Sequence, residues 1–284
     1  MNRKTRICVS FLAVALVTGL AFAQYRGRRG GGGGYRSSRV QDITVDRNGV
    51  PTWEVDPNFK SDLFTFVRVR YNDGGWGRGG GWRTDWPDSD LNFSFRLQQL
   101  TSLKVEPYPI SLDLTDEKLF DYPFIYMIEP GDLQFSEEEV VALRRYLLNG
   151  GFMMVDDFWG EEEWFTFYGE IKRVFPDREP QELDLSHPVF NNVYKLTEKP
   201  QVPSINHAMA FRGTNRTWER PDAEEVHYKG IFDDNGRMMV IICHNTDLGD
   251  GWEREGEDEY YFKEFSEKKA YPMGINIVFY AMTH

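Results

Sequence analysis

Continuous apolar runs recur along the chain and predict strands that are covered on both faces. Phe64 to Arg70 is rich in β-branched and aromatic residues, while Phe124 to Ile128 and Phe152 to Val155 are unbroken apolar runs. Such runs are typical of parallel strands that lie between two layers of helices. The pattern therefore predicts the strands of a sheet whose two faces are both buried.

Helical spacing separates these runs. Ser136 and Glu139 form a capping-box pattern ahead of apolar residues at helical intervals, and Asn149-Gly150-Gly151 ends the segment. A second helix is expected from a cap at Asp88 or Ser89 to about Thr101. Further helices are expected within residues 161–174 and 271–282, whereas residues 177–227 show no confident order.

The order of these elements predicts the fold class. Ile231-Phe232 and Arg237 to Cys243 flank Asp233-Asp234-Asn235-Gly236, and Asn-Gly between apolar runs predicts a β-hairpin. Elsewhere, strands and helices alternate. The sequence thus predicts one α/β domain over residues 61–284, a three-layer sandwich with a mainly parallel sheet.

The first sixty residues have a different composition. Residues 1–23 combine a basic start, an apolar stretch and an Ala21-Phe22-Ala23 site, which predicts a cleaved signal peptide and an exported protein, periplasmic or secreted. The alternative is a retained membrane anchor, for which the apolar run is short. Residues 24–60 are expected to be a flexible Gly/Arg-rich linker and lead-in. No later segment is apolar enough to cross a bilayer.

Charge and cysteine content exclude some classes of function. The whole chain carries a formal charge of −12; eight basic residues and no acids lie in residues 1–39, so residues 40–284 carry −20. Such a domain would be repelled by phosphate backbones, so we expect no nucleic-acid partner. After signal cleavage Cys243 is the one remaining cysteine, so an internal disulfide is excluded.

Several motifs resemble the domain of unknown function 4159 family over about residues 62–284. They are Phe66-Val67-Arg68-Val69-Arg70-Tyr71, Thr84-Asp85-Trp86-Pro87, Leu119-Phe120-Asp121-Tyr122-Pro123, residues 146–158, residues 236–240 and residues 274–284. The resemblance implies a flavodoxin-like α/β sandwich similar to the class I glutamine amidotransferase group. It implies no particular activity.

The turn that carries the nucleophile in that group is expected at Val155 to Gly160, and it contains no Cys, Ser or Thr. Cys243 ends a different strand in an apolar run, where a thiol is more often buried and inert. The adjacent His244 would point to the opposite face of the strand. Glutaminase chemistry is therefore not expected despite the implied fold.

Carboxylates follow several predicted strands. The carboxyl ends of parallel strands share one edge of a sheet, where ligands bind, so these acids are expected to converge: Asp156, Asp157, Glu129, Asp73 and Asp85. We predict no cofactor, although an oxygen-only cluster would suit Ca²⁺ or Mg²⁺. Within the pair after the 152–155 strand, one aspartate is expected to cap the following helix and Asp157 to face the cleft. Alternatively, both acids are capping or solvated groups.

Tryptophans are expected near the same edge, at Trp76, Trp82 and Trp159. Exposed aromatic rings beside acids would suit a glycan or a protein partner. Alternatively, the nearby Trp86 and Trp164 pack on the core and only Trp76 and Trp82 are exposed. The sequence favours a non-catalytic binding module. The alternative is a carboxylate- or metal-dependent hydrolase acting on glycans or a related substrate, with Asp156 or Asp157 as base and Glu129 as second carboxylate.

Overall fold

A computed structural model of the chain describes residues 47–59, 62–72 and 81–284. The signal peptide and Gly/Arg-rich segment predicted from the sequence therefore lie outside the described residues. No helix within the described ranges combines the length and the apolar character needed to cross a membrane.

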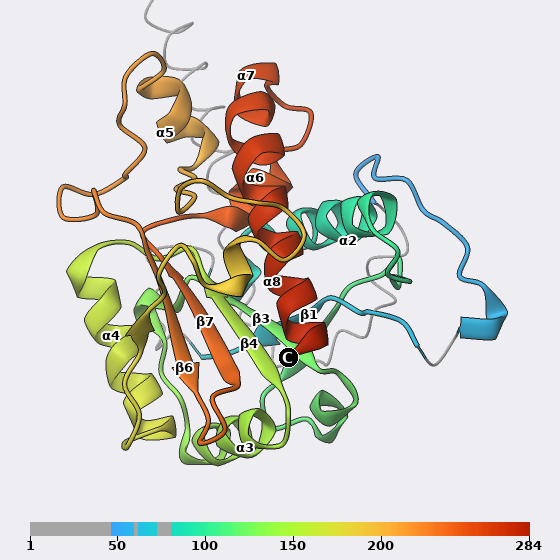
Figure 1. Cartoon of the computed structure of the whole chain (residues 1–284), viewed down its shortest axis with the longest axis vertical. Coiled ribbons are helices and arrows are strands. Elements are labelled where there is room, and N and C mark those ends of the chain that lie inside the picture. The colour runs from blue at the N-terminus through green and yellow to red at the C-terminus, as the bar shows by residue number, and fades with distance from the viewer. Residues whose placement is uncertain (1–46, 60–61, 73–80) are drawn as a thin grey trace, which may run out of the picture. The chain divides into compact units, whose positions relative to one another are not determined.

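Seven strands of the described residues form one sheet in the order β2-β1-β3-β4-β7-β6-β5. Figure 1 labels β1, β3, β4, β7 and β6 of this sheet. The strands are β1 (Val67–Arg70), β2 (Ile110–Asp113), β3 (Phe124–Ile128), β4 (Phe152–Asp156), β5 (Gln181–Glu182), β6 (His227–Phe232) and β7 (Met238–His244). β2, β1, β3, β4 and β7 pair in parallel, whereas β6 is antiparallel to β7 and β5. The predicted hairpin and the mainly parallel sheet are both confirmed.

The central strands are buried on both faces, as their apolar runs predict. Phe124, Tyr126 and Ile128 of β3 pack into one core cluster, while Ile125 and Met127 pack into the other. Because successive side chains of a strand point to opposite faces, a strand between two cores needs apolar residues at every position.

β1 is shorter than the predicted strand because Phe64 makes only an isolated bridge, to Val105.

Helices cover both faces of the sheet. Their bounds are α2 (Asp88–Leu100), α3 (Glu137–Leu148), α4 (Gly160–Val174), α5 (Ile205–Ala210), α6 (Leu248–Glu253), α7 (Glu259–Tyr261) and α8 (Tyr271–Thr283), with a π-helical stretch at Phe262–Ala270. α2, α6 and α8 contribute to one core cluster, and α3 and α4 to the other. In Figure 1, α8 lies in front of the central strands. The described residues thus form the predicted three layers.

The two helix starts predicted from the sequence have different outcomes. Ser136 caps α3 as expected, and Glu139 returns a hydrogen bond to complete the capping box. At α2 the prediction is wrong, because Pro87 precedes the helix and neither Asp88 nor Ser89 caps it. The Ser89 hydroxyl is instead engaged inside the protein with Arg68 and Asp90.

Residues 47–59, which the sequence assigned to the lead-in, pack against the domain. Arg47 donates to the carbonyl oxygen of Pro107 at 2.5 Å, and the Trp53 indole donates to that of Val105 at 2.8 Å. Asn48 donates to Asp88 at the start of α2. The Asn48 contact places this part of the segment beside the start of α2.

The capping box makes a direct prediction. Ser136→Ala removes the side-chain acceptor for the Glu139 amide at 3.2 Å and should destabilise the protein by about 1 kcal/mol. In a domain of this size, that loss corresponds to a fall in Tm of about 2–4 °C. Calorimetry of both proteins checks this, and an unchanged Tm would show that the cap contributes nothing.

Candidate functional site

The carboxyl ends of β1, β3, β4 and β7 open into an acidic cavity of about 430 Å³. Among the described residues that line it, eight are carboxylic acids and two are arginines. The acids are Asp85, Glu129, Asp132, Asp157, Glu163, Glu219, Asp247 and Asp250. Three of the predicted site acids, at positions 85, 129 and 157, thus meet in one cavity with acids that follow β7.

Those three predicted acids share an unusual backbone conformation. Asp85, Glu129 and Asp157 have φ values of 60°, 47° and 55°, in the left-handed region that side chains other than glycine rarely adopt. Two contacts hold the turn at Glu129: the Tyr71 hydroxyl donates to the Glu129 carbonyl oxygen, and the Gly81 amide donates to the Glu129 carboxylate at 2.8 Å. Backbone strain of this kind clusters at functional sites.

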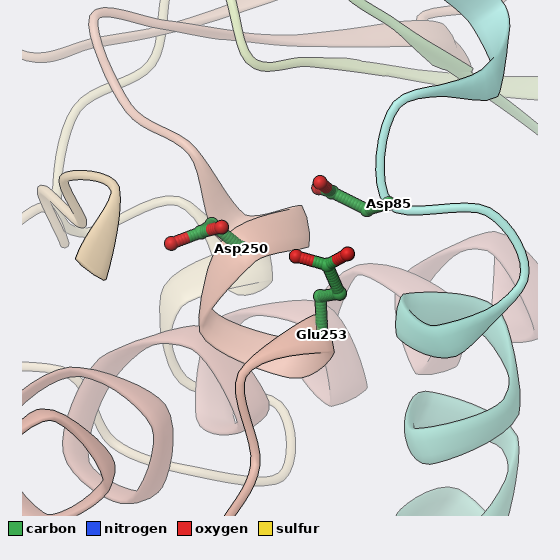
Figure 2. A group of neighbouring side chains, drawn as sticks. All are labelled: Asp85, Asp250 and Glu253. Atoms are coloured by element: carbon green, nitrogen blue, oxygen red, sulfur yellow. The ribbon is translucent and has the colours of Figure 1, made fainter. Parts of the chain in front are cut away.

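Three carboxylates come close enough to share one cation. Asp85, in the loop between β1 and α2, faces Asp250 and Glu253 of α6 (Figure 2), and their nearest oxygens all lie within 4.8 Å of one another. Asp85 Oδ2 is buried and receives no hydrogen bond from the described residues. A Cβ added at Gly249 would lie 2.9 Å from that oxygen, so glycine permits the close approach of α6.

The acids disfavour one another's ionisation. Burial raises the pKa of Asp85 well above its ordinary value, and the neighbouring Glu253 and Asp250 carboxylates raise it further. The same two causes act on Asp157, through Glu129 and Asp85, and on Asp247, through Asp157 and Asp250. Burial raises the pKa of Glu253 to about 7. An electropositive occupant would relieve this repulsion.

Asp156 lies beneath the cavity and does not line it. Its side chain is 0% exposed and accepts hydrogen bonds from the Tyr126 hydroxyl and the Gly249 amide, each at 3.0 Å. The expected division between the paired aspartates is thus present, with Asp157 in the cavity. The prediction that this aspartate caps the next helix, α4, was wrong. Asp156 accepts a hydrogen bond from the start of α6 instead.

Other side chains accept hydrogen bonds from the backbone amides at the start of α4. The Trp159 amide donates to Glu163, the Gly160 amide to Asn245, and the Glu161 amide to Asp222. Neither Asn245 nor Asp222 is close to β4 in sequence, which is why local capping rules could not identify them. These three amides are therefore already satisfied within the protein.

The predicted tryptophans do not form an exposed platform among the described residues. Trp159 lines the cavity but is only 5% exposed, and its indole N–H donates to Asp157 at 3.3 Å. Trp82 is partly buried against the core that includes α3 and α4, and does not line the cavity. Trp76 and Asp73 lie outside the described residues.

The sequence patterns did not predict that the acids after β7 belong to the site. Asp247, Asp250 and Glu253 follow a strand that the sequence analysis ended at Cys243, and their short helix has no amphipathic repeat to reveal it. The signal that could have found them is the rule applied to the other strands, that acids directly after a parallel strand face the ligand edge. Cys243 itself is fully buried, and burial raises the pKa of its thiol.

Comparison with known proteins identifies a family and no activity. The sequence model of a family described as a domain of unknown function, DUF4159, matches residues 65–282. The match includes every strand of the sheet and every acid that lines the cavity. No curated protein matches the chain.

Asp156 should make stability depend on pH. Burial raises its pKa from 3.8 to about 7, so the folded protein keeps this proton over a range where the unfolded chain has released it. Stability is therefore lost as pH rises from about 4 to 7, by at most about 4 kcal/mol. Asp156→Asn keeps an acceptor oxygen, and should gain stability over the wild type as pH rises.

Urea unfolding of both proteins at pH 5 and pH 8, in the presence of a chelator, measures this effect. We expect the free energy of unfolding of Asp156→Asn minus that of the wild type to be larger at pH 8. A difference that does not change with pH would show that Asp156 ionises with an ordinary pKa.

Proposed function

Because the chain belongs to the DUF4159 family, whose description assigns no activity, we propose its function from the geometry of the acidic cavity. The protein is an exported binding module that holds a divalent cation between Asp85, Asp250 and Glu253. The observation that carries this proposal is the convergence of three carboxylates around a buried Asp85 oxygen that accepts no hydrogen bond from the residues that the structure describes.

The donor set fits a hard cation. Ca²⁺ and Mg²⁺ prefer oxygen ligands, and Ca²⁺ accepts six to eight of them. Asp250 is prepared for such a role, because the Ile205 amide and the Tyr261 hydroxyl donate to one of its oxygens at 2.6 and 3.2 Å and fix its orientation. Three carboxylates leave further coordination positions, which oxygen atoms of a protein or glycan partner can fill.

The strand order supports this place for a ligand. β2-β1-β3-β4-β7 follows the 2-1-3-4-5 order of flavodoxin-like sheets, which supports grouping the domain with that fold and with the class I amidotransferases. In such sheets ligands bind where the strand order reverses, here between β1 and β3. Asp85 and Glu129 follow those two strands.

The contacts at the start of α4 favour binding over acyl-transfer chemistry. Amides at a strand-to-helix turn can stabilise an oxyanion only if they point into an open site. Here Glu163, Asn245 and Asp222 accept hydrogen bonds from all three. The hydrolase alternative also loses Asp156 as a base, because that carboxyl group lies beneath the cavity.

The tripartite segment at residues 1–23 supports export, and the charge of −20 on residues 40–284 supports an electropositive occupant. An excess of buried carboxylates also supports a cation over an anionic ligand. We therefore propose that the cation mediates contact with an extracytoplasmic protein or glycan.

Replacing Asp85 tests the proposal. At pH 7.5, Asp85→Asn should raise the Tm of the cation-free protein, because it removes a carboxyl group whose ionisation is disfavoured by burial and by Glu253 and Asp250. The same change should abolish the stabilisation by Ca²⁺ or Mg²⁺. For the wild type at one hundred times Kd, that stabilisation is about 2.7 kcal/mol, or roughly 5–10 °C.

Asp121→Asn is the matched control, because Asp121 is exposed and precedes β3, at the opposite end of the strand from the cavity. It should keep the full cation-induced shift. Calorimetry and isothermal titration of the three proteins decide the matter. A wild type that binds neither ion, or an Asp85→Asn protein that still binds with wild-type affinity, would refute the proposed site.

A further inference from the structure

The two halves of the proposed cation site come from separate parts of the sheet. Asp85 follows β1, whereas Asp250 and Glu253 belong to α6, which follows β7. β3 and β4 lie between these two strands. The spacing of the three carboxylates therefore depends on how the Asp85 loop and α6 are each fixed to the central strands.

Arg68 of β1 fixes the Asp85 loop. Its side chain is fully buried, and one terminal nitrogen donates to the carbonyl oxygens of Trp82 and Thr84, the latter directly before Asp85. The rest of the guanidinium is bound to the start of α2, through Asp90 at 2.5 and 3.1 Å and Ser89 at 2.9 Å. The loop is thus held at its backbone from within the core.

Tyr126 of β3 continues this chain of contacts toward α6. The Arg68 guanidinium lies 5.1 Å from the centre of the Tyr126 ring, and the Tyr126 hydroxyl donates to Asp156. The same oxygen of Asp156 accepts the Gly249 amide at the start of α6. A Cβ at Gly249 would lie 2.9 Å from the Tyr126 hydroxyl oxygen as well as from Asp85, so the two halves meet there.

We infer that Arg68, Tyr126 and Asp156 are positioning residues of the cation site, a role that rests on the proposed function. They form a buried polar chain that holds Asp85 and α6 at the separation one cation requires. None of the three lines the cavity, so their effect on the ion is exerted through the loop and the helix. Contacts of this kind tune metal affinity because they set the orientation of the ligands.

Tyr126→Phe is the sharpest test, because it removes one hydroxyl and keeps the ring beneath Arg68. We expect the Kd for Ca²⁺ or Mg²⁺ to rise about tenfold to a hundredfold. Tyr228→Phe is the matched control, since Tyr228 is also fully buried and its hydroxyl donates to the carbonyl oxygen of Pro200. Neither Tyr228 nor Pro200 lines the cavity. The control should keep the wild-type Kd even if its Tm falls.

Terbium luminescence supplies a measurement that a loss of general stability would not change. Tb³⁺ bound in place of Ca²⁺ should show a shorter lifetime in Tyr126→Phe than in the control, because misplaced carboxylates are replaced by water. Arg68→Lys, compared with Arg70→Lys on the same strand, repeats the test at the Arg68 end of the buried polar chain. Arg70 binds Asp113 instead, and it forms no hydrogen bond with residues 81–87, the described part of the loop that holds Asp85.

The outcomes separate the two proposals. If the wild type binds the ion and Tyr126→Phe and Arg68→Lys bind it with unchanged Kd and Tb³⁺ lifetime, the positioning role is refuted and the cation site stands. If the wild type binds no ion, the proposed function fails and the positioning role fails with it. Weaker binding by Tyr126→Phe but not by Tyr228→Phe supports both.

Discussion

The buried guanidinium of Arg68 joins the sheet to the loop that delivers Asp85 to the cavity. A charge without exposure to water must be compensated by hydrogen bonds in several directions, and Asp90, Ser89 and the loop carbonyl oxygens supply them. Arginine suits this position because its planar fork can serve separate acceptors at once. The loop after β1 and the first turn of α2 therefore have one arrangement rather than several.

The carboxyl ends of β1, β3, β4 and β7 bring carboxylates together with few compensating cations. Two described arginines line the cavity, and Arg220 forms an ion pair with Glu163. Arg254 forms ion pairs with Asp250 and with Glu253, which does not itself line the cavity. Neither arginine forms an ion pair with Asp85, Asp157 or Asp247 among the described residues. Mutual repulsion and burial raise the pKa of these three acids together. A polypeptide gains no stability from this arrangement, which is why we interpret it as a ligand site.

The turn after β4 combines a left-handed backbone residue with amides that are hydrogen-bonded within the protein. The strand ends at Asp156, and Asp157 after it adopts a left-handed backbone before α4 begins. The amides of this turn are satisfied by side chains from α4, from the loop after β7 and from the 211–226 region. The protein therefore uses these backbone amides itself, and carboxylates rather than free amides line the cavity.

Local sequence determined much of the fold. Apolar runs located β3 and β4, the Ser136 capping box located α3, and Asn-Gly located the hairpin between β6 and β7. These features depend on neighbouring residues, so local patterns suffice. The rule that acids gather at the carboxyl ends of parallel strands also brought Asp85, Glu129 and Asp157 to one edge, and the structure places all three in the same cavity.

Only the tertiary structure decided which groups complete the site. It brought Asp250 and Glu253 beside Asp85, placed Asp156 beneath the cavity, and buried Trp159 against Asp157. It also gave the start of α4 its partners, Asn245 and Asp222, from distant segments. Apart from the Trp159–Asp157 contact, these contacts join residues far apart in the chain. Their distances follow from the packing of loops and short helices over the strand ends, a geometry that no local spacing of residue types contains.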